Sequence, residues 1–164
     1  MPYDARGIAN LALDLAHELD LSLTHMAVHK VVFFAHGWYL ATYRKPLVQQ
    51  NFEAWEFGPV LKSVYSAFKN FGNSPITSRI EHFDLIEGKR QIIAANVGED
   101  DVAFVRKIVE VYGPLHAFQL SQLTHRTGGA WDRVWNAPDG KISLGMRITN
   151  DMIIQDFLER RLDS

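Results

Sequence analysis

Histidines are the residues of this sequence whose type and spacing could most readily do chemistry, and there are seven of them. His25 and His29 are four positions apart, which places two imidazoles on one face of a helix, as in helical metal sites. No glutamate of an H-E-x-x-H motif lies between them, and no third ligand is evident. We therefore expect no metal and no cofactor, and we interpret both as surface or half-buried histidines.

An acid–base or hydrolytic site is the second possibility. His36 lies inside an aromatic run and His125 ends the segment LSQLTH, and the simplest interpretation of each is a buried imidazole bonded to backbone. Glu53 and Glu56 fall on opposite sides of an alternating segment, so they do not form an acid–base pair. The chain has no cysteine, no G-x-S-x-G, no P-loop and no G-x-G-x-x-G. We expect no catalytic residues and no enzyme activity.

Composition favours one folded domain in the cytoplasm. The 164 residues are 47% hydrophobic and 22% charged, with a net charge of −2, which is ordinary for a globular protein. Acidic residues interrupt the apolar positions of the N-terminus, unlike a secretory signal, and no apolar run approaches the roughly 20 residues of a membrane-spanning helix. Lysines and arginines are scattered rather than gathered into a stripe. We expect one domain over residues 1–164 that contacts no membrane and is unlike a nucleic-acid-binding protein.

Helices dominate the elements that must position these residues. Asp4 is placed to cap a first helix, and Thr24 to cap a second that runs from His25 to about Tyr43 and is buried on most sides. Within it, Gly37 predicts the close approach of another backbone. Further helices are predicted from Asp100 to Tyr112, after Gly113-Pro114, at Trp131–Trp135, and from a cap at Thr149 or Asn150 to the C-terminus.

Strand signals are few. Residues Asn51 to Phe57 alternate and predict a strand, after which Gly58 turns the chain and Pro59 takes the first position of the next helix. Residues 76–100 indicate either a loose hairpin or an irregular excursion, and Pro138-Asp139-Gly140 a turn. The predicted fold is therefore mainly α: a single compact helical domain with a minor β-strand or hairpin element.

Two segments resemble a known family. Residues 33–41 (FFAHGWYLA), 45–47 (KPL) and 52–60 (FEAWEFGPV), with Val64, Tyr65 and Phe68, closely resemble the Panacea antitoxin domain. Residues 120–125 (LSQLTH) and Trp131 are similar to the second signature of that family, in which a proline usually stands where this chain has Ala130. The resemblance covers the chain from about Asp4 to Leu162. The family includes phage-associated proteins and an antitoxin that works as a proteolytic adaptor.

The resemblance implies an antitoxin that binds and neutralises a cognate protein toxin. It does so either by masking the active surface of the toxin or by holding the toxin for an ATP-dependent protease. A DNA-binding autorepressor and a hydrolase that uses His36, Glu53 and His125 are the alternatives.

Among the residues that the resemblance covers, Gly37, Gly58 and Pro59 are expected to serve backbone geometry. Aromatic side chains at helical spacing pack in cores more often than they bind partners, and we expect Trp55 in particular to be buried. The residues that we nominate for partner binding are His36, Trp38, Tyr39, Glu53, Trp55, Tyr65, His125 and Trp131.

Overall fold

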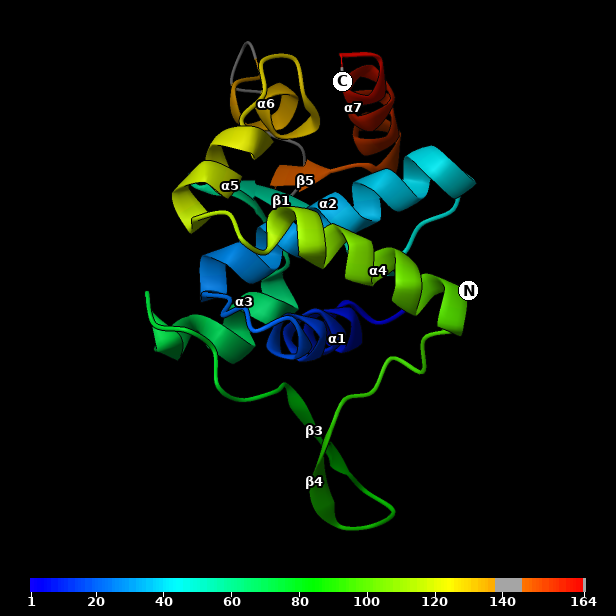
Figure 1. Cartoon of the computed structure of the whole chain (residues 1–164), viewed down its shortest axis with the longest axis vertical. Coiled ribbons are helices and arrows are strands. Elements are labelled where there is room, and N and C mark those ends of the chain that lie inside the picture. Colours follow the sequence, from blue (N-terminus) through cyan, green and yellow to red (C-terminus); the bar gives the residue numbers. More distant parts are fainter. Residues whose placement is uncertain (138–145, 164) are drawn as a thin grey trace.

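Helices make up most of the computed structural model, which describes residues 1–137 and 146–163 (Figure 1). The predicted turn at Pro138-Asp139-Gly140 lies outside these residues. The prediction of a mainly α fold with a minor β element is confirmed. The helices are α1 (Ala5–Glu18), α2 (His25–Tyr43), α3 (Lys62–Phe68), α4 (Glu99–Tyr112), α5 (Ala117–Thr124), α6 (Ala130–Trp135) and α7 (Asn150–Asp163), with a 3-10 turn, η1 (Lys69–Phe71).

Side-chain caps start the helices where the sequence predicts them. The Asp4 carboxylate accepts from the Arg6 N–H, the Thr24 hydroxyl from the Ala27 N–H, and the Thr149 hydroxyl from the N–H of Met152. Helix α2 ends at Tyr43, and the next residue, Arg44, caps it in the left-handed conformation, so the helix stops before it reaches Pro46.

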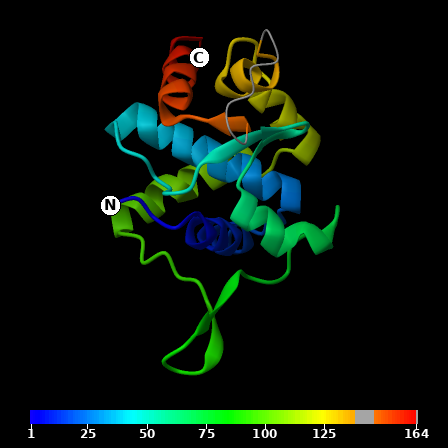
Figure 2. The ribbon, with the colours of Figure 1, turned by 180° about the vertical axis from the view of Figure 1, so that it is seen from behind.

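Helix α2 runs through the middle of the molecule. Helix α4 packs on one side of it and the small sheet on the other, as the front and back views show (Figures 1 and 2). Its Phe33 ring meets the Phe52 and Phe157 rings at 5.2 and 5.5 Å between centroids. Phe33 and Leu40 of α2 and Val64 and Phe68 of α3 are all buried.

Three short strands form an antiparallel sheet in the order β2-β1-β5. They are β1 (Phe52–Trp55), β2 (Gly58–Val60) and β5 (Arg147–Ile148). The predicted strand is therefore present but shorter than Asn51–Phe57. The expectation that Pro59 starts a helix is wrong, because Pro59 lies opposite Ala54 in β2 and α3 begins only at Lys62. Strand β2 is an edge strand, where the missing proline N–H is tolerated.

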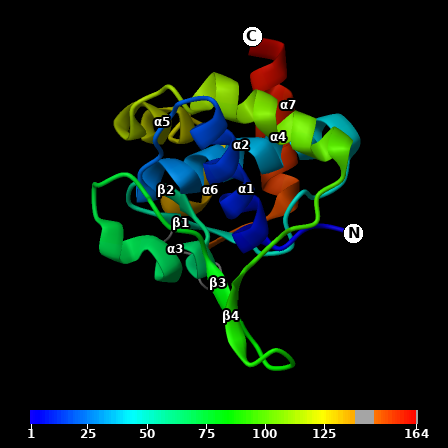
Figure 3. The same ribbon diagram turned by 60° about the horizontal axis from the view of Figure 1, so that its bottom comes forward.

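A second ribbon, β3 (Glu81–Asp84) with β4 (Lys89–Ile92), projects from the body of the molecule (Figure 3). Of the two alternatives for residues 76–100, the hairpin is correct. Its base is held by Asn10, whose amide donates to the carbonyls of Ile80 and Ile93 and accepts from the Ile80 N–H. This buried amide explains how a ribbon with mostly exposed strands is fixed to α1.

Among the described residues, none of the helices combines the length and the apolar character that crossing a membrane requires.

Gly37 makes room for a side chain rather than for the predicted backbone. A Cβ at this position would collide with the ring of Phe157 on α7. We propose that α2 and α7 belong to one cooperative domain, so that this contact affects the stability of the whole chain.

We expect thermal unfolding to show one transition, and Gly37→Ala to lower its midpoint. The overpacking costs about 1–3 kcal/mol, which outweighs a gain in helix propensity of about 1 kcal/mol. In the control Gly98→Ser, the added Cβ has only the Tyr3 hydroxyl near it, at 4.0 Å, so the midpoint should barely change. Two separate transitions, or equal midpoints for the two variants, would contradict the proposal.

Candidate functional site

Five of the eight nominated residues lie together. The Trp131 indole N–H donates to the Trp55 carbonyl at 2.7 Å, and the His125 ring stacks on Trp131 at 3.7 Å between centroids. The Trp55 ring lies 4.7 Å from the Tyr65 ring, and its N–H donates to a Glu53 carboxylate oxygen at 3.2 Å. We call Glu53, Trp55, Tyr65, His125 and Trp131 the aromatic site.

Strand β1 explains why Trp55 is only half-buried, which corrects the expectation of a core tryptophan. Successive side chains of a strand point to opposite faces, and here Phe52 and Ala54 enter the core while Glu53 and Trp55 take the other face. Trp131, by contrast, is only 5% exposed. The outward face of β1 therefore carries an amphipathic ring at the protein surface.

The other three nominated residues are engaged elsewhere. Trp38 donates its indole N–H to the Tyr112 hydroxyl and packs edge-on against Phe157. Tyr39 packs against Phe104, and burial followed by hydrogen bonding to Asp101 raises the pKa of Tyr39 to about 12. Both side chains are partly exposed, and a role for them in partner binding stays a prediction.

His36 is a buried imidazole bonded to backbone, as expected, but the same expectation is wrong for His125, which is only half-buried and whose Nε2 atom has no hydrogen-bond partner in the described part of the chain. The Val48 N–H donates to Nδ1 at 3.3 Å, so the ring proton is on Nε2, which donates to the Asn150 side-chain oxygen at 2.8 Å. Burial lowers the pKa of His36 to about 4, and the ring is therefore neutral at pH 7.

His25 and His29 are also buried, which contradicts the expectation of surface or half-buried rings. They are 5% and 0% exposed, because Tyr65 covers His25 and the β2–α3 junction covers His29. The Leu61 N–H donates to His29 Nδ1 at 3.1 Å, while the Nε2 atoms of both rings have no hydrogen-bond partner. The described part of the chain contains no group of three or more His, Cys, Asp or Glu side chains that could hold a metal ion.

Lys30 is a buried charged residue that the sequence analysis did not single out. It is fully buried, its ammonium group donates to the Pro59 carbonyl at 3.2 Å, and burial lowers its pKa to about 7. Gly58, with a φ of 121°, lies against it: a Cβ there would be 2.7 Å from Lys30 Cε and 2.8 Å from the Thr124 hydroxyl. Lys30 is the one Lys, Arg, Asp or Glu in α2. A single charged residue in an otherwise apolar helix is the sequence signal that could have identified it as a buried lysine.

Asp156 fixes the helix that carries Trp131. This carboxylate is 2% exposed, accepts from the Ala130 N–H at 2.9 Å and pairs with Arg160 at 2.8 Å. A proline at position 130, as is usual in the resembling family, could not donate this hydrogen bond. The alanine therefore gives α6 an additional attachment to α7.

A groove of about 450 Å³ opens beside the aromatic site, between α3 and α5. Phe57 and Phe118, which are 60% and 66% exposed, lie along it together with Tyr65 of the aromatic site. The alternating pattern and the helical spacing in the sequence did not predict that these two phenylalanines are exposed. We call this hollow the aromatic groove; its lining is His25, Met26, Phe57, Tyr65, Lys69, Gly72, Asn73, Ala117, Phe118 and Ser121.

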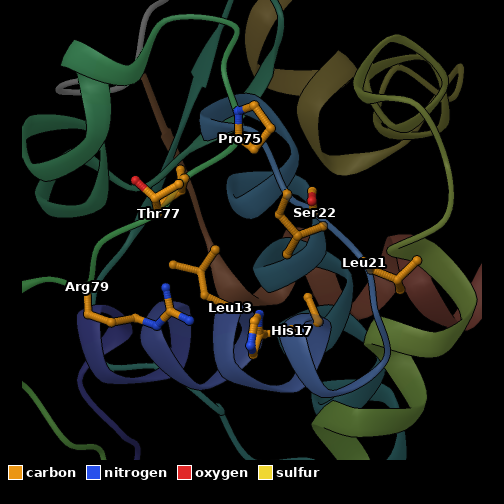
Figure 4. A pocket seen from close by; sticks show the side chains of 10 residues that line it. Leu13, His17, Leu21, Ser22, Pro75, Thr77 and Arg79 are labelled. Carbon is orange, nitrogen blue, oxygen red and sulfur yellow. The ribbon is translucent and has the colours of Figure 1, made fainter.

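A second hollow, of about 320 Å³, lies between α1 and the segment that leads to β3 (Figure 4). Leu13, Leu21 and Pro75 are among its lining residues. Arg79, at its edge, is already paired with Asp14 at 2.7 Å. The aromatic groove is the stronger candidate because it adjoins the nominated residues.

The aromatic site and its groove form a partly exposed aromatic surface, which buried hydrogen bonds and ion pairs support. Comparison with known proteins gives the family. A family model described as antitoxin SocA-like, Panacea domain, matches residues 28–132. Antitoxin SocA of Caulobacter vibrioides (strain NA1000 / CB15N) is 37% identical over 153 residues, covering 93% of this chain and 81% of the relative. The chain therefore belongs to the SocA-like antitoxins with a Panacea domain. No solved structure matches it.

Lys30 makes stability depend on pH. Its folded pKa of about 7 lies below the 10.5 of an exposed lysine, so between these values the unfolded chain binds more protons. The free energy of unfolding contributed by this residue then rises with pH from about 7 to 10.5.

We expect Lys30→Met to lose this dependence, because methionine does not titrate. The free energy of unfolding of Lys30→Met relative to the parent chain should therefore fall by up to about 1.4 kcal/mol per pH unit over this range. Urea unfolding at several pH values measures it. The control is Lys62→Met, at an exposed lysine, and parallel curves for the parent and Lys30→Met would contradict the prediction.

The two tryptophans of the aromatic site should differ in stability. Trp131→Ala removes a side chain that is almost fully buried and should cost about 3–5 kcal/mol, whereas Trp55→Ala should cost roughly half as much because Trp55 is half-buried. Urea unfolding of both variants gives the two values. Equal losses would show that Trp55 contributes as much to the core as Trp131.

Proposed function

We propose that this protein is the antitoxin of a toxin–antitoxin system and neutralises a cognate protein toxin by binding it directly, without catalysis. The observation that carries the proposal is its membership of the SocA-like antitoxin family, supported over nearly the whole chain by the relative in Caulobacter vibrioides. A protein that acts by binding needs an exposed surface of suitable chemistry, and the aromatic site with its groove supplies a candidate.

Several features support this surface as the binding site. Tyrosine and tryptophan are enriched among residues that contribute most to protein interfaces, and Trp55 and Tyr65 are both half-exposed here. Phe57 and Phe118 add apolar area beside them. Trp131 and His125 support the surface from below, because the Trp131 indole holds the backbone of β1 at Trp55.

Binding of this kind serves two mechanisms. Masking requires only that the antitoxin covers the active surface of the toxin. Delivery to an ATP-dependent protease requires a second surface that stays accessible in the complex, and the projecting β3–β4 hairpin is our candidate for it (Figure 3). The level of toxin in cells with and without the protease distinguishes the two mechanisms.

The alternatives find less support. Arginines gather near the base of the hairpin, yet Arg6, Arg79 and Arg90 are each paired with a carboxylate, which weakens a nucleic-acid-binding surface. In the hydrolase hypothesis, His36 has both ring nitrogens engaged by hydrogen bonds, and neither it nor His125 lines the aromatic groove.

We expect one product of the neighbouring genes to stop growth when expressed alone, and co-expression of this protein to restore growth. The same product should co-purify with the parent chain but bind Trp55→Ala at least tenfold more weakly, because the half-exposed Trp55 ring is part of the proposed surface. Circular dichroism confirms that the variant is folded. Leu162→Ser, at a residue of α7 that is 85% exposed, is the control and should bind normally. Harmless neighbours that do not bind would remove the basis of the proposal.

A further inference from the structure

The two exposed phenylalanines of the aromatic groove are carried on a well-held backbone. The Phe57 carbonyl accepts from the Ser121 hydroxyl at 2.8 Å, which joins the β1–β2 turn to α5. Phe118 lies in the first turn of α5, where its N–H donates to His116 and the Gln119 side chain completes a capping box. The backbone that carries both rings is therefore held in place before any partner arrives, which reduces the entropy lost on binding.

The ionisable residues along the groove include a lysine and a histidine but no acidic side chain. They are His25, Tyr65 and Lys69, and the lining includes no aspartate or glutamate. Lys69 is exposed and makes no ion pair with the described residues. Lys30 lies behind the lining, close enough for its charge to lower the pKa of His25, although burial is the larger cause. A carboxylate is the group that this surface favours.

A hydrogen-bonding group at the floor is also unused. His25 is 5% exposed, lines the groove, and its Nε2 atom has no partner. Buried polar atoms are nearly always hydrogen-bonded, so an unpaired one beside a groove indicates a place for a polar group of a ligand. The lining of one hollow therefore combines apolar walls, an exposed cation and a histidine with an unpaired ring nitrogen.

We propose that the aromatic groove binds a segment of the toxin in which an apolar side chain stands next to a carboxylate. The apolar side chain packs between Phe57 and Phe118, and the carboxylate pairs with Lys69. This inference rests on the proposed function, since it names the chemistry of the toxin segment, but the groove can be tested without the toxin.

The first test uses two synthetic eight-residue peptides as probes. Both contain a central phenylalanine–leucine pair, flanked by aspartates in one and by lysines in the other. Binding is followed by the amide NMR signals of the 15N-labelled full chain. We expect the acidic peptide to bind at least tenfold more tightly than the basic one and to shift the signals of Tyr65, Lys69 and Phe118. Equal affinities, or shifts elsewhere on the chain, would overturn the inference.

Matched variants test the carboxylate contact and the apolar contact separately. Lys69→Glu should weaken the acidic peptide at least tenfold and reverse the preference between the peptides, while Phe118→Ala should weaken both. Both residues are exposed, so the fold should be retained. Lys107→Glu changes the charge equally at an exposed position of α4, outside the groove, and should leave binding unchanged. Equal losses in Lys69→Glu and Lys107→Glu would show a general charge effect and overturn the inference.

The second test uses the toxin identified by co-expression. A toxin that binds the parent chain but is unaffected by combined Lys69→Glu and Phe118→Ala would overturn this inference and leave the proposed function standing. If no neighbouring product binds at all, the proposed function fails and the peptides alone decide the groove. A dimer in sedimentation that dissociates in Phe118→Ala would make a second copy of the chain the occupant, and would also overturn the inference.

Discussion

Helix α2 is buried along most of its length, so its polar side chains must find hydrogen bonds inside the protein. Three of them find such bonds in backbone groups of the segments that wrap the helix, whereas the Nε2 atoms of His25 and His29 have no partner among the described residues. His29 accepts from the Leu61 N–H, Lys30 donates to the Pro59 carbonyl, and His36 accepts from the Val48 N–H. An unsatisfied buried polar group costs about 1–3 kcal/mol, so these three pairings fix where residues 48–61 can lie against α2. The small sheet is attached to the helical body in this way.

The position of the candidate site follows from that attachment. Once Pro59 and Leu61 are tied to α2, the turn before them projects Phe57 outward and the outer face of β1 presents Trp55. Trp131 then binds the Trp55 carbonyl from α6, which Asp156 of α7 holds in place. The surface is thus assembled from segments far apart in the chain. Loss of a supporting contact destabilises the fold and so weakens binding indirectly. Each binding variant therefore needs a stability measurement as well.

The family motif covers residues of two different kinds. Trp38 and Tyr39 join α2 to α7 and α4, whereas Trp55 and Tyr65 pack against each other in the aromatic site, and Tyr65 also lines the groove. A resemblance in sequence does not distinguish the two kinds, because packing in the fold and binding of a partner each restrict the residue types that a position accepts. All four side chains are partly exposed, so the elements that their rings contact separate the two kinds, and the charge of the groove lining then narrows the chemistry of a partner.

The sequence by itself determined most of the helices, their caps at Asp4 and Thr24, and the family, because helical spacing, capping and motifs are local properties of the chain. It also determined that His36 is a buried, bonded imidazole. Only the tertiary structure decided that Pro59 lies in a strand, since that depends on pairing with β1 and on Lys30 of a distant helix. The same is true of the half-exposed position of Trp55: alternation defines two faces of a strand, but which face meets the core depends on what packs against it.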